Sequence, residues 1–307
     1  MTPDPRQSDF RTPDGVRVSL SLWNGGGPPQ LLLVHGFGDN ALVWQHFAST
    51  LGNACALAVD LRGHGRSDWD PAGAYALADF VADVVQVLEA LCPSPVLLVG
   101  HSLGAQIAMR VAAARRHRIR AVVLTDVALR SNDLVADQVR RKLRERRGVY
   151  DSVAQYVALL HEQLPLARTS LLEVLAEGAL RRREDGRYED RADPALVHMD
   201  DAIDPPLIVA TLKQIARPIL FVRGVGSAVL SRAAAHEVLA ELPQARMAAV
   251  ATAGHSVMLD NPEGFSAAVR PYVLRFSSAS PGAAATAESY PVGGVGGRLE
   301  AAGGRDI

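Results

Sequence analysis

Cysteine is scarce in this sequence, and long apolar runs are missing from it. The 307 residues include only two cysteines, Cys55 and Cys92, so no disulfide framework is expected. The longest strictly apolar run covers residues 54–59, far short of the roughly 18 residues that a membrane-spanning helix requires. The first six residues are polar and contain no signal-peptide core. We therefore expect a cytoplasmic protein that does not enter a membrane.

The sequence also lacks an excess of charge of either sign. Its 32 Lys and Arg residues balance 33 Asp and Glu residues, which gives a formal net charge of −1. This balance provides no overall field for binding nucleic acid or an anionic membrane. Apolar residues make up 48% of the chain, enough for a full core, and this composition excludes a wholly disordered or collagen-like protein.

Short apolar runs alternate with longer helical patterns between residues 16 and 276. The strand-like runs are residues 16–23, 31–34, 55–59, 96–99, 121–124, 219–222 and 248–251. Apolar spacing typical of helices occurs at residues 75–91, 103–116 and 232–242. Continuous apolar strands are typical of a sheet that is buried on both faces. The alternation predicts a doubly wound, mostly parallel α/β sheet with right-handed crossovers.

The stretch from residue 128 to residue 205 breaks this alternation. It contains helical patterns at residues 133–147, 152–164 and 169–183 and no good strand. An all-helical insertion between two parallel strands predicts a lid over the carboxyl edge of the sheet, where ligands bind. The alternative is a helical excursion that only covers a sheet face.

These patterns divide the chain into three parts. Residues 1–127 and 206–276 would form the α/β core, and residues 128–205 the helical lid. Residues 277–307 are rich in Ala, Gly, Ser and Pro and have no periodicity. This composition predicts a disordered tail.

The sharpest chemical signal is the segment Gly100-His101-Ser102-Leu103-Gly104. It follows the predicted strand at 96–99 and opens a predicted helix, which is the strand–turn–helix setting of a nucleophile elbow. Small residues are needed at positions 100 and 104, because side chains there would collide with the neighbouring strand and helix. The strained turn would raise the Ser102 hydroxyl above the sheet, and the helix N-terminus would favour a developing oxyanion.

Two further segments lie where a serine nucleophile would need them. Residues 34–39, Val-His-Gly-Phe-Gly-Asp, close an earlier buried strand, and the backbone N–H of Phe37 would form an oxyanion hole with that of Leu103. A plain glycine turn is the alternative. His255 lies in residues 253–256, Ala-Gly-His-Ser, after the last predicted strand, and is a candidate general base. A structural histidine is the alternative there.

Together these motifs resemble the α/β-hydrolase superfamily over about residues 10–276. Residues 60–67, Asp-Leu-Arg-Gly-His-Gly-Arg-Ser, also look like that family's turn after the strand preceding the elbow strand, and we interpret them as structural. The resemblance implies the fold and a Ser102–His255 catalytic pair. It says much less about the substrate, because this superfold hosts many reactions.

The sequence departs from the family pattern at the acid of the triad. Members usually carry this acid a few residues after the strand that follows the lid, and Ser227 occupies that position here. Some members draw the acid from the strand after the elbow, which makes Asp126 the expected partner of His255. The alternatives are a Ser102–His255 dyad helped by Ser227 or water, with Asp126 only capping the strand, or a loss of efficient hydrolysis.

Basic runs at residues 140–147 and 181–183 mark the predicted lid. Nearby acidic residues would neutralise them on a solvated face. The sharper hypothesis is recognition of an acidic partner such as a carrier protein, or of an anionic substrate. The sequence contains no G-x-x-x-x-G-K-[ST] loop, no paired cysteines and no metal-spaced histidines, so we expect neither a metal nor a cofactor.

We therefore predict a serine hydrolase that cleaves a carboxylic ester, lactone or thioester of a small-molecule acyl substrate. Ser102 argues against the epoxide hydrolases and haloalkane dehalogenases of this fold, which use an aspartate nucleophile. Two alternatives stay open. One is a cofactor-independent lyase or cyclase on the same scaffold, which the missing acid at Ser227 favours. The other is a non-catalytic protein that binds a small molecule.

Overall fold

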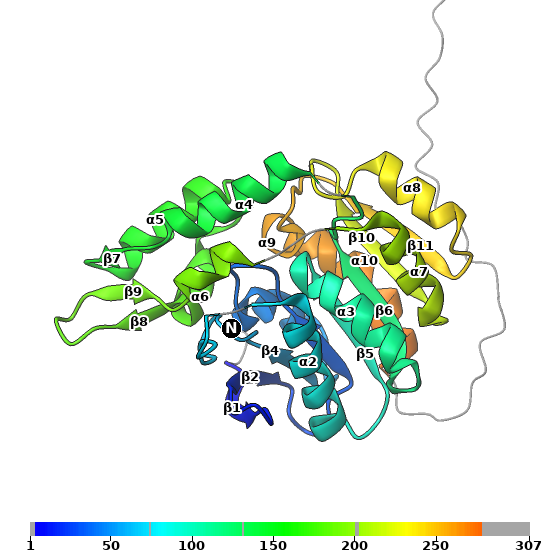
Figure 1. The fold of residues 1–307 in the computed structure, drawn as a ribbon, viewed down its shortest axis with the longest axis horizontal. Helices are drawn as coiled ribbons and strands as arrows, with labels where there is room; N and C mark the ends of the chain where they lie inside the picture. The colour runs from blue at the N-terminus through cyan, green and yellow to red at the C-terminus, as the bar shows by residue number, and fades with distance from the viewer. Residues whose placement is uncertain (1–3, 74, 131, 200–202, 278–307) are drawn as a thin grey trace, which may run out of the picture.

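The computed structural model describes residues 4–73, 75–130, 132–199 and 203–277, and an eight-stranded sheet forms its centre (Figure 1). The strands lie in the order β1-β2-β4-β3-β5-β6-β10-β11. Their bounds are β1 Arg6–Arg11, β2 Arg17–Trp23, β3 Leu31–Val34, β4 Ala56–Val59, β5 Val96–His101, β6 Ile119–Thr125, β10 Ile219–Gly224 and β11 Ala245–Val250. Neighbouring strands from β4 to β11 are parallel, whereas β2 is antiparallel to β1 and β4. The predicted mostly parallel sheet is confirmed.

Helices cover both faces of this sheet. One apolar core includes residues of α2 Leu77–Leu91, α3 Leu103–Ala114, α7 Pro205–Ile215 and α8 Arg232–Ala240. The other includes residues of the 3-10 helix η1 Ala41–Trp44 and of α1 Gln45–Ser49, α9 Val257–Asp260 and α10 Pro262–Phe276. The helices predicted at 75–91, 103–116 and 232–242 correspond to α2, α3 and α8, each with slightly shorter bounds.

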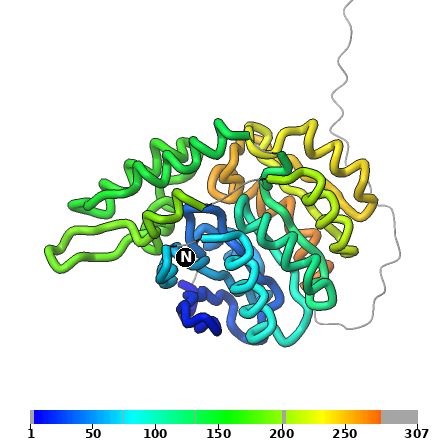
Figure 2. The backbone as a smooth tube through the Cα atoms, viewed as in Figure 1, coloured from blue at the N-terminus to red at the C-terminus, as the bar shows by residue number. Residues whose placement is uncertain are grey.

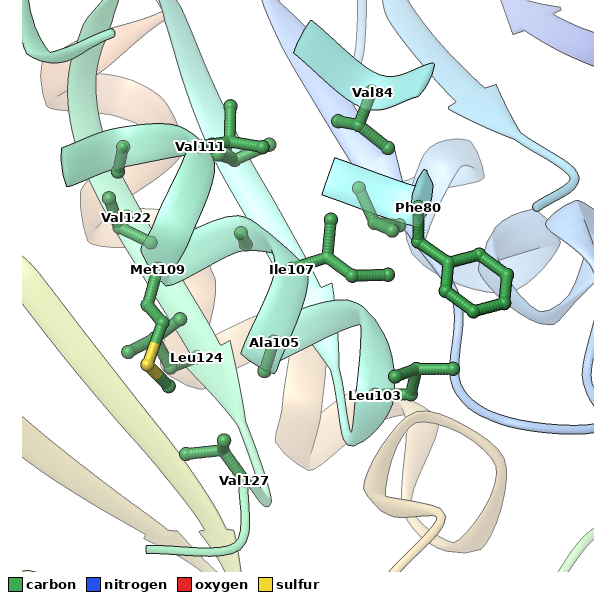
Figure 3. Close-up of a cluster of buried hydrophobic side chains, with 14 of the residues drawn as sticks. Phe80, Val84, Leu103, Ala105, Ile107, Met109, Val111, Val122, Leu124 and Val127 are labelled. Carbon is green, nitrogen blue, oxygen red and sulfur yellow. The ribbon is translucent and has the colours of Figure 1, made fainter. Parts of the chain in front are cut away.

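Burial on both faces explains why the central strands, such as β3, are apolar without interruption. In β3, Leu32 and Val34 belong to the first core, and Leu31 and Leu33 belong to the second. Successive side chains of a strand point to opposite faces, so a strand covered by helices on both sides needs apolar residues throughout. Figure 3 shows part of the first core, with Ile107 of α3 among its labelled side chains.

The segment between β6 and α7 differs from the prediction. It contains α4 Asp133–Glu145, α5 Val153–Gln163, α6 Thr169–Ala179 and the 3-10 helix η3 Pro194–His198. It also contains an antiparallel sheet of three short strands in the order β7-β9-β8, with bounds β7 Val149–Tyr150, β9 Tyr188–Asp190 and β8 Leu180–Arg182. The prediction of helices alone is therefore wrong for this segment, which projects beyond the core on one side (Figure 2).

The error lies in the helix predicted at residues 169–183. This helix ends at Ala179, and residues 180–190 form a hairpin instead. The turn contains Asp185 and Gly186, and Gly186 has a φ of +84°. An Asp-Gly pair between two extended runs is a strong hairpin signal, so the sequence did contain the correct information.

Two predictions concern the membrane and the tail. In the part of the chain that the structure describes, no helix is long and apolar enough to cross a membrane. The disordered tail predicted at residues 277–307 lies outside the described residues except for Ser277, which follows α10.

Candidate active site

Ser102 lies in the turn between β5 and α3, at the carboxyl edge of the sheet. Its φ of 52° and ψ of −115° are unfavourable for a residue with a side chain. The flanking glycines make the turn possible. A Cβ atom on Gly100 would lie 2.3 Å from the carbonyl oxygen of Gly104, and one on Gly104 would lie 2.2 Å from the carbonyl oxygen of Val34. Backbone atoms cannot move aside, so both positions require glycine.

His255 and Asp126 complete a line of hydrogen bonds that begins at Ser102. His255, in the loop after β11, places Nε2 3.0 Å from Ser102 Oγ and Nδ1 2.7 Å from Asp126 Oδ2. Asp126 follows β6, is fully buried and has a φ of 45°. Because Nδ1 faces a carboxylate, it carries the ring proton, and Nε2 is left to accept a proton from the Ser102 hydroxyl. The structure thus brings the three predicted residues together.

Ser227 lies beside the same carboxylate. Its hydroxyl donates a hydrogen bond to Asp126 Oδ2 and accepts one from the backbone N–H of Val229 at 3.0 Å. His255 Nδ1 contacts Asp126 and not Ser227. The position that carries the acid in other members therefore holds a hydrogen-bond donor to a carboxylate from β6.

The loop that follows β3 forms one wall of the site. Phe37 lines the same cavities as Ser102 and His255, and Leu103 lines the first of them. Gly38 has a φ of +72°, and the backbone N–H of Asp39 donates to the carbonyl oxygen of Gly36 at 3.2 Å. The loop is thus a tight turn that holds Phe37 next to the nucleophile.

Side chains of the segment between β6 and α7 hold this loop in place. The buried guanidinium of Arg146 donates from Nη1 to the carbonyl oxygen of Gly38 at 2.8 Å and from Nε to Gln163 Oε1 at 2.8 Å. Asn40, at the other end of the loop, donates from Nδ2 to the carbonyl oxygen of Leu175 at 3.0 Å. Sequence reasoning placed Arg146 in a basic run on a solvated face, which is wrong for this residue, and it did not single out Asn40. Nothing in their local sequence shows that they are buried.

Two buried histidines lie beneath the loop and are held neutral. His35 Nδ1 donates to the carbonyl oxygen of Gly36 at 2.8 Å, and Nε2 accepts from the backbone N–H of Leu61 at 3.0 Å. Burial lowers the pKa of His35 to about 4. Burial, reinforced by the neighbouring His35, lowers the pKa of His64 to about 3. The acceptor role of His35 Nε2 is available only in the uncharged ring.

These histidines predict a loss of stability in mild acid. The unfolded chain binds protons on both residues near their ordinary pKa of 6.5, whereas the folded chain does so only near pH 4 and pH 3. Between pH 6.5 and pH 4 the unfolded state therefore binds more protons, and the free energy of unfolding decreases as the pH falls. Each histidine contributes a slope of about 1.4 kcal/mol per pH unit.

Urea unfolding between pH 7 and pH 4.5 measures this slope. In His35→Gln, the amide oxygen replaces the Nε2 acceptor and cannot be protonated in this range. We expect the slope of this variant to be smaller than that of the wild type by about one proton. An unchanged slope would show that His35 is already protonated in the folded protein.

Two cavities meet at Ser102 and His255. The first has a volume of about 170 Å³ and is lined by residues of α3 and α4 and by Met199 and Ile203, with mostly apolar walls and the arginines Arg110, Arg130 and Arg140. The second, of about 240 Å³, lies over the Phe37 loop and is more polar. A substrate bound with its reacting carbonyl at Ser102 would extend into both cavities.

Some residues of the basic runs, and the nearby Arg187, are paired with acids. Arg181 Nε and Arg183 Nη1 each lie 2.7 Å from a carboxylate oxygen of Glu189, and Arg187 lies 2.8 Å from Asp185. Arg141 lies 3.7 Å from the Glu145 carboxylate one turn away. Such exposed pairs have little effect on stability, but they reduce the net charge of this surface. Binding of an acidic carrier protein there stays a prediction.

The fold and the arrangement around Ser102 define the class of protein. The chain belongs to the alpha/beta hydrolase family, whose model matches residues 31–268. Within the described residues, no group of three or more His, Cys, Asp or Glu side chains is arranged to hold a metal ion.

Individual relatives are hydrolases and esterases. The chain is 26% identical over 254 residues to the 2-(acetamidomethylene)succinate hydrolase of Mesorhizobium japonicum, covering 82% of this chain and 91% of that protein. It is 30% identical over 261 residues to an esterase of Mycobacterium tuberculosis, covering 82% and 85% respectively. These relatives support an enzyme of the hydrolase type.

Solved structures show the same fold. The crystal structure of the E-2-(acetamidomethylene)succinate hydrolase superimposes with a TM-score of 0.77 at 24% identity, over 87% of this chain and 99% of that one. The structure of the Mycobacterium tuberculosis esterase gives a TM-score of 0.74 at 28% identity, over 88% and 92%. Both superpositions place this chain in the alpha/beta hydrolase fold.

Proposed function

We propose that this chain hydrolyses a carboxylic ester, lactone or thioester of a small-molecule acyl substrate through a covalent acyl-enzyme on Ser102. The observation that carries the proposal is the line of hydrogen bonds from Ser102 Oγ through His255 to the buried carboxylate of Asp126. A serine at a strained strand–helix turn, with a histidine within hydrogen-bond reach, is the arrangement that nucleophilic catalysis needs.

In the first half of this reaction, Ser102 Oγ bonds to the acyl carbonyl carbon while His255 Nε2 takes the hydroxyl proton. Asp126 stabilises the imidazolium that forms. The backbone N–H groups of Phe37 and Leu103 are the donors we assign to the carbonyl oxygen as it becomes negative. The imidazolium then gives its proton to the leaving oxygen or sulfur, and the bond from the carbonyl carbon to the leaving group breaks.

In the second half, water replaces the leaving group. His255 Nε2 takes a proton from the water as its oxygen bonds to the acyl carbon, and Ser102 Oγ leaves with the proton returned by His255. The segment of residues 128–205 acts as a lid in this proposal. Val135 and Val139 of α4 line both cavities and exclude solvent from the reacting atoms.

A fluorophosphonate probe followed by intact-mass measurement tests the nucleophile. We expect one covalent adduct on the wild type and none on Ser102→Ala, because the probe reacts only with an activated serine. His255→Ala is the matched variant: it keeps the hydroxyl but removes its base, and we expect labelling to slow severely. Circular dichroism of both variants confirms that they are folded.

The opposite outcome assigns the site to another reaction class. A folded wild type that takes up no adduct contradicts an acyl-enzyme on Ser102. Turnover of a substrate that survives Ser102→Ala would indicate the lyase or cyclase alternative, in which His255 acts without a covalent intermediate. Stoichiometric binding without turnover would indicate a binding protein.

A further inference from the structure

Along one face of α3, the candidate nucleophile Ser102 is followed by a partly buried cation, Arg110. Ser102 precedes the helix, and Gln106 and Arg110 follow at intervals of four residues, so the three side chains lie on one side of it. All three line the 170 Å³ cavity together with His255. Other side chains of α3, among them Met109 and Val111, point into the apolar core (Figure 3). Arg110 therefore belongs to the wall of the site and not to the outer surface.

Arg110 differs from the other arginines of this cavity in its partners. Arg130 is exposed and forms an ion pair with Glu237, and Arg140 lies 3.7 Å from Asp137. Arg110 Nη1 donates to the carbonyl oxygen of Gln106 at 2.9 Å and to Gln106 Oε1 at 2.8 Å, both within its own helix.

No carboxylate compensates the charge of Arg110 within the described residues. Burial lowers its pKa, and no acidic group acts on it in the opposite direction. Among the described residues that line the cavity, one is acidic, Asp133 of α4. A partly buried guanidinium without a counter-ion has unused donors that suit a carboxylate, which it can bind through two parallel hydrogen bonds.

Helix geometry gives the distance between this cation and the nucleophile. Side chains of a helix lean toward its N-terminus, and the contacts with Gln106 place the guanidinium no more than one turn before the Arg110 backbone. Four to eight residues at about 1.5 Å per residue then separate it from Ser102 by about 6–12 Å along the axis. The hydrogen bond to a carboxylate and the approach of Ser102 to the carbonyl carbon each take up about 3 Å, so a zigzag carbon chain of up to about five bonds fits between the two ends.

We propose that Arg110 selects substrates that carry a carboxylate up to about five bonds from the reacting carbonyl carbon. This inference rests on the proposed ester or thioester hydrolysis and assigns a substrate class to it. The apolar walls of the cavity, which include Val135, Val139 and Met199, would bind the carbon chain between the two ends.

Matched pairs of esters test the proposal. The acyl-side pair is the mono-p-nitrophenyl ester of adipic acid and its terminal carboxamide. The leaving-group pair is the acetate ester of 4-hydroxybutanoic acid and that of 4-hydroxybutanamide, in which the carboxyl carbon also lies five bonds from the reacting carbonyl carbon. We expect kcat/KM of the wild type to favour the carboxylate over the carboxamide by roughly tenfold to hundredfold in one pair, as charge-assisted hydrogen bonds do.

Substitution of the arginine should abolish this preference. In Arg110→Gln we expect the ratio of the two kcat/KM values to fall to near one. Arg115→Gln is the control, because Arg115 caps the same helix, pairs with Glu89 and lies outside the residues that line the cavity. Its carboxylate preference should equal that of the wild type. A wild-type ratio near one in both pairs, or a ratio that survives Arg110→Gln, overturns the proposal while ester hydrolysis itself stands.

Failure of the proposed function gives a different result. If the wild type cleaves none of the four esters, calorimetric binding of the same esters to Ser102→Ala decides the inference without turnover. Tighter binding of a carboxylate ester than of its carboxamide, lost in Ser102→Ala/Arg110→Gln, supports a carboxylate subsite. Equal binding within both pairs overturns it.

Discussion

Replacing Asp126 by asparagine is expected to lower kcat about 10⁴-fold, the loss that the same change causes in serine proteases. The carboxylate accepts the Nδ1 proton of His255 at 2.7 Å, which leaves Nε2 unprotonated and directed at Ser102. An asparagine amide can donate to Nδ1 and so stabilises the tautomer in which Nε2 already carries a proton. Steady-state hydrolysis of a p-nitrophenyl ester, with the folded state checked by circular dichroism, measures the effect.

Ser227 provides the control and the rescue for this prediction. Ser227→Ala removes one donor from the carboxylate but keeps the carboxylate itself, so its loss of kcat should be much smaller than that of Asp126→Asn. Asp126→Asn/Ser227→Asp returns a carboxylate from the loop after β10 and should recover part of the activity. If Asp126→Asn retains kcat within tenfold of the wild type, then Asp126 is structural and a serine–histidine dyad operates.

The second large effect concerns stability and lies in the turn after β4. Arg62 is almost completely buried, and its Nε and Nη2 donate to both carboxylate oxygens of Asp83 at 2.7 Å. Its remaining donors reach Asp70 at 3.1 Å and Asp14 at 2.9 Å. Arg62→Met should lower the free energy of unfolding by about 3–5 kcal/mol, because Asp83 is left charged and buried without a partner.

Chemical denaturation of two variants separates the charge from the packing. Arg62→Met leaves the Asp83 side chain, which is only 2% exposed, without its counter-ion. Arg62→Met/Asp83→Leu removes both charges and should recover a substantial part of the lost stability. A double variant that is no more stable than Arg62→Met would show that the shape of the guanidinium fork, and not the unpaired carboxylate, determines the cost. A large loss of stability in Arg62→Met would support the structural interpretation of the turn at residues 60–67.

The parts of the fold that the sequence predicted are those buried on both faces. The strands β3, β4, β5, β6 and β10 read as apolar runs because helices cover them on either side. β1 was not predicted, because its residues Arg6–Arg11 are mostly exposed and polar, and only pairing with β2 makes them a strand. In the segment between β6 and α7, the short strands β8 and β9 contain charged residues, β7 has only two residues, and the three pair only with one another.

In the candidate site, too, the residues in local motifs could be predicted, whereas contacts between distant segments could not. The elbow around Ser102 and the loop of His255 are recognisable because each is a short motif next to its own strand. The proximity of Asp126 to His255 depends on β6 lying beside β10 in the sheet, which no local pattern encodes. Arg110 and Arg146 belong to the 30 arginines of the chain, and only the folded structure shows that they line the two cavities.

The hydrogen bonds of Arg146 and Asn40 affect how a molecule can enter and leave the site. They connect α4 and α6 to the loop that carries Phe37, so lifting these helices from the core would withdraw the supports of that loop. A molecule that entered while the helices were lifted would reach the site when the Phe37 loop lacked both hydrogen bonds. Product would then leave from the conformation with lifted helices, and the reaction would occur in the one with the helices in place. The rate of interconversion between the two conformations would set an upper limit on turnover.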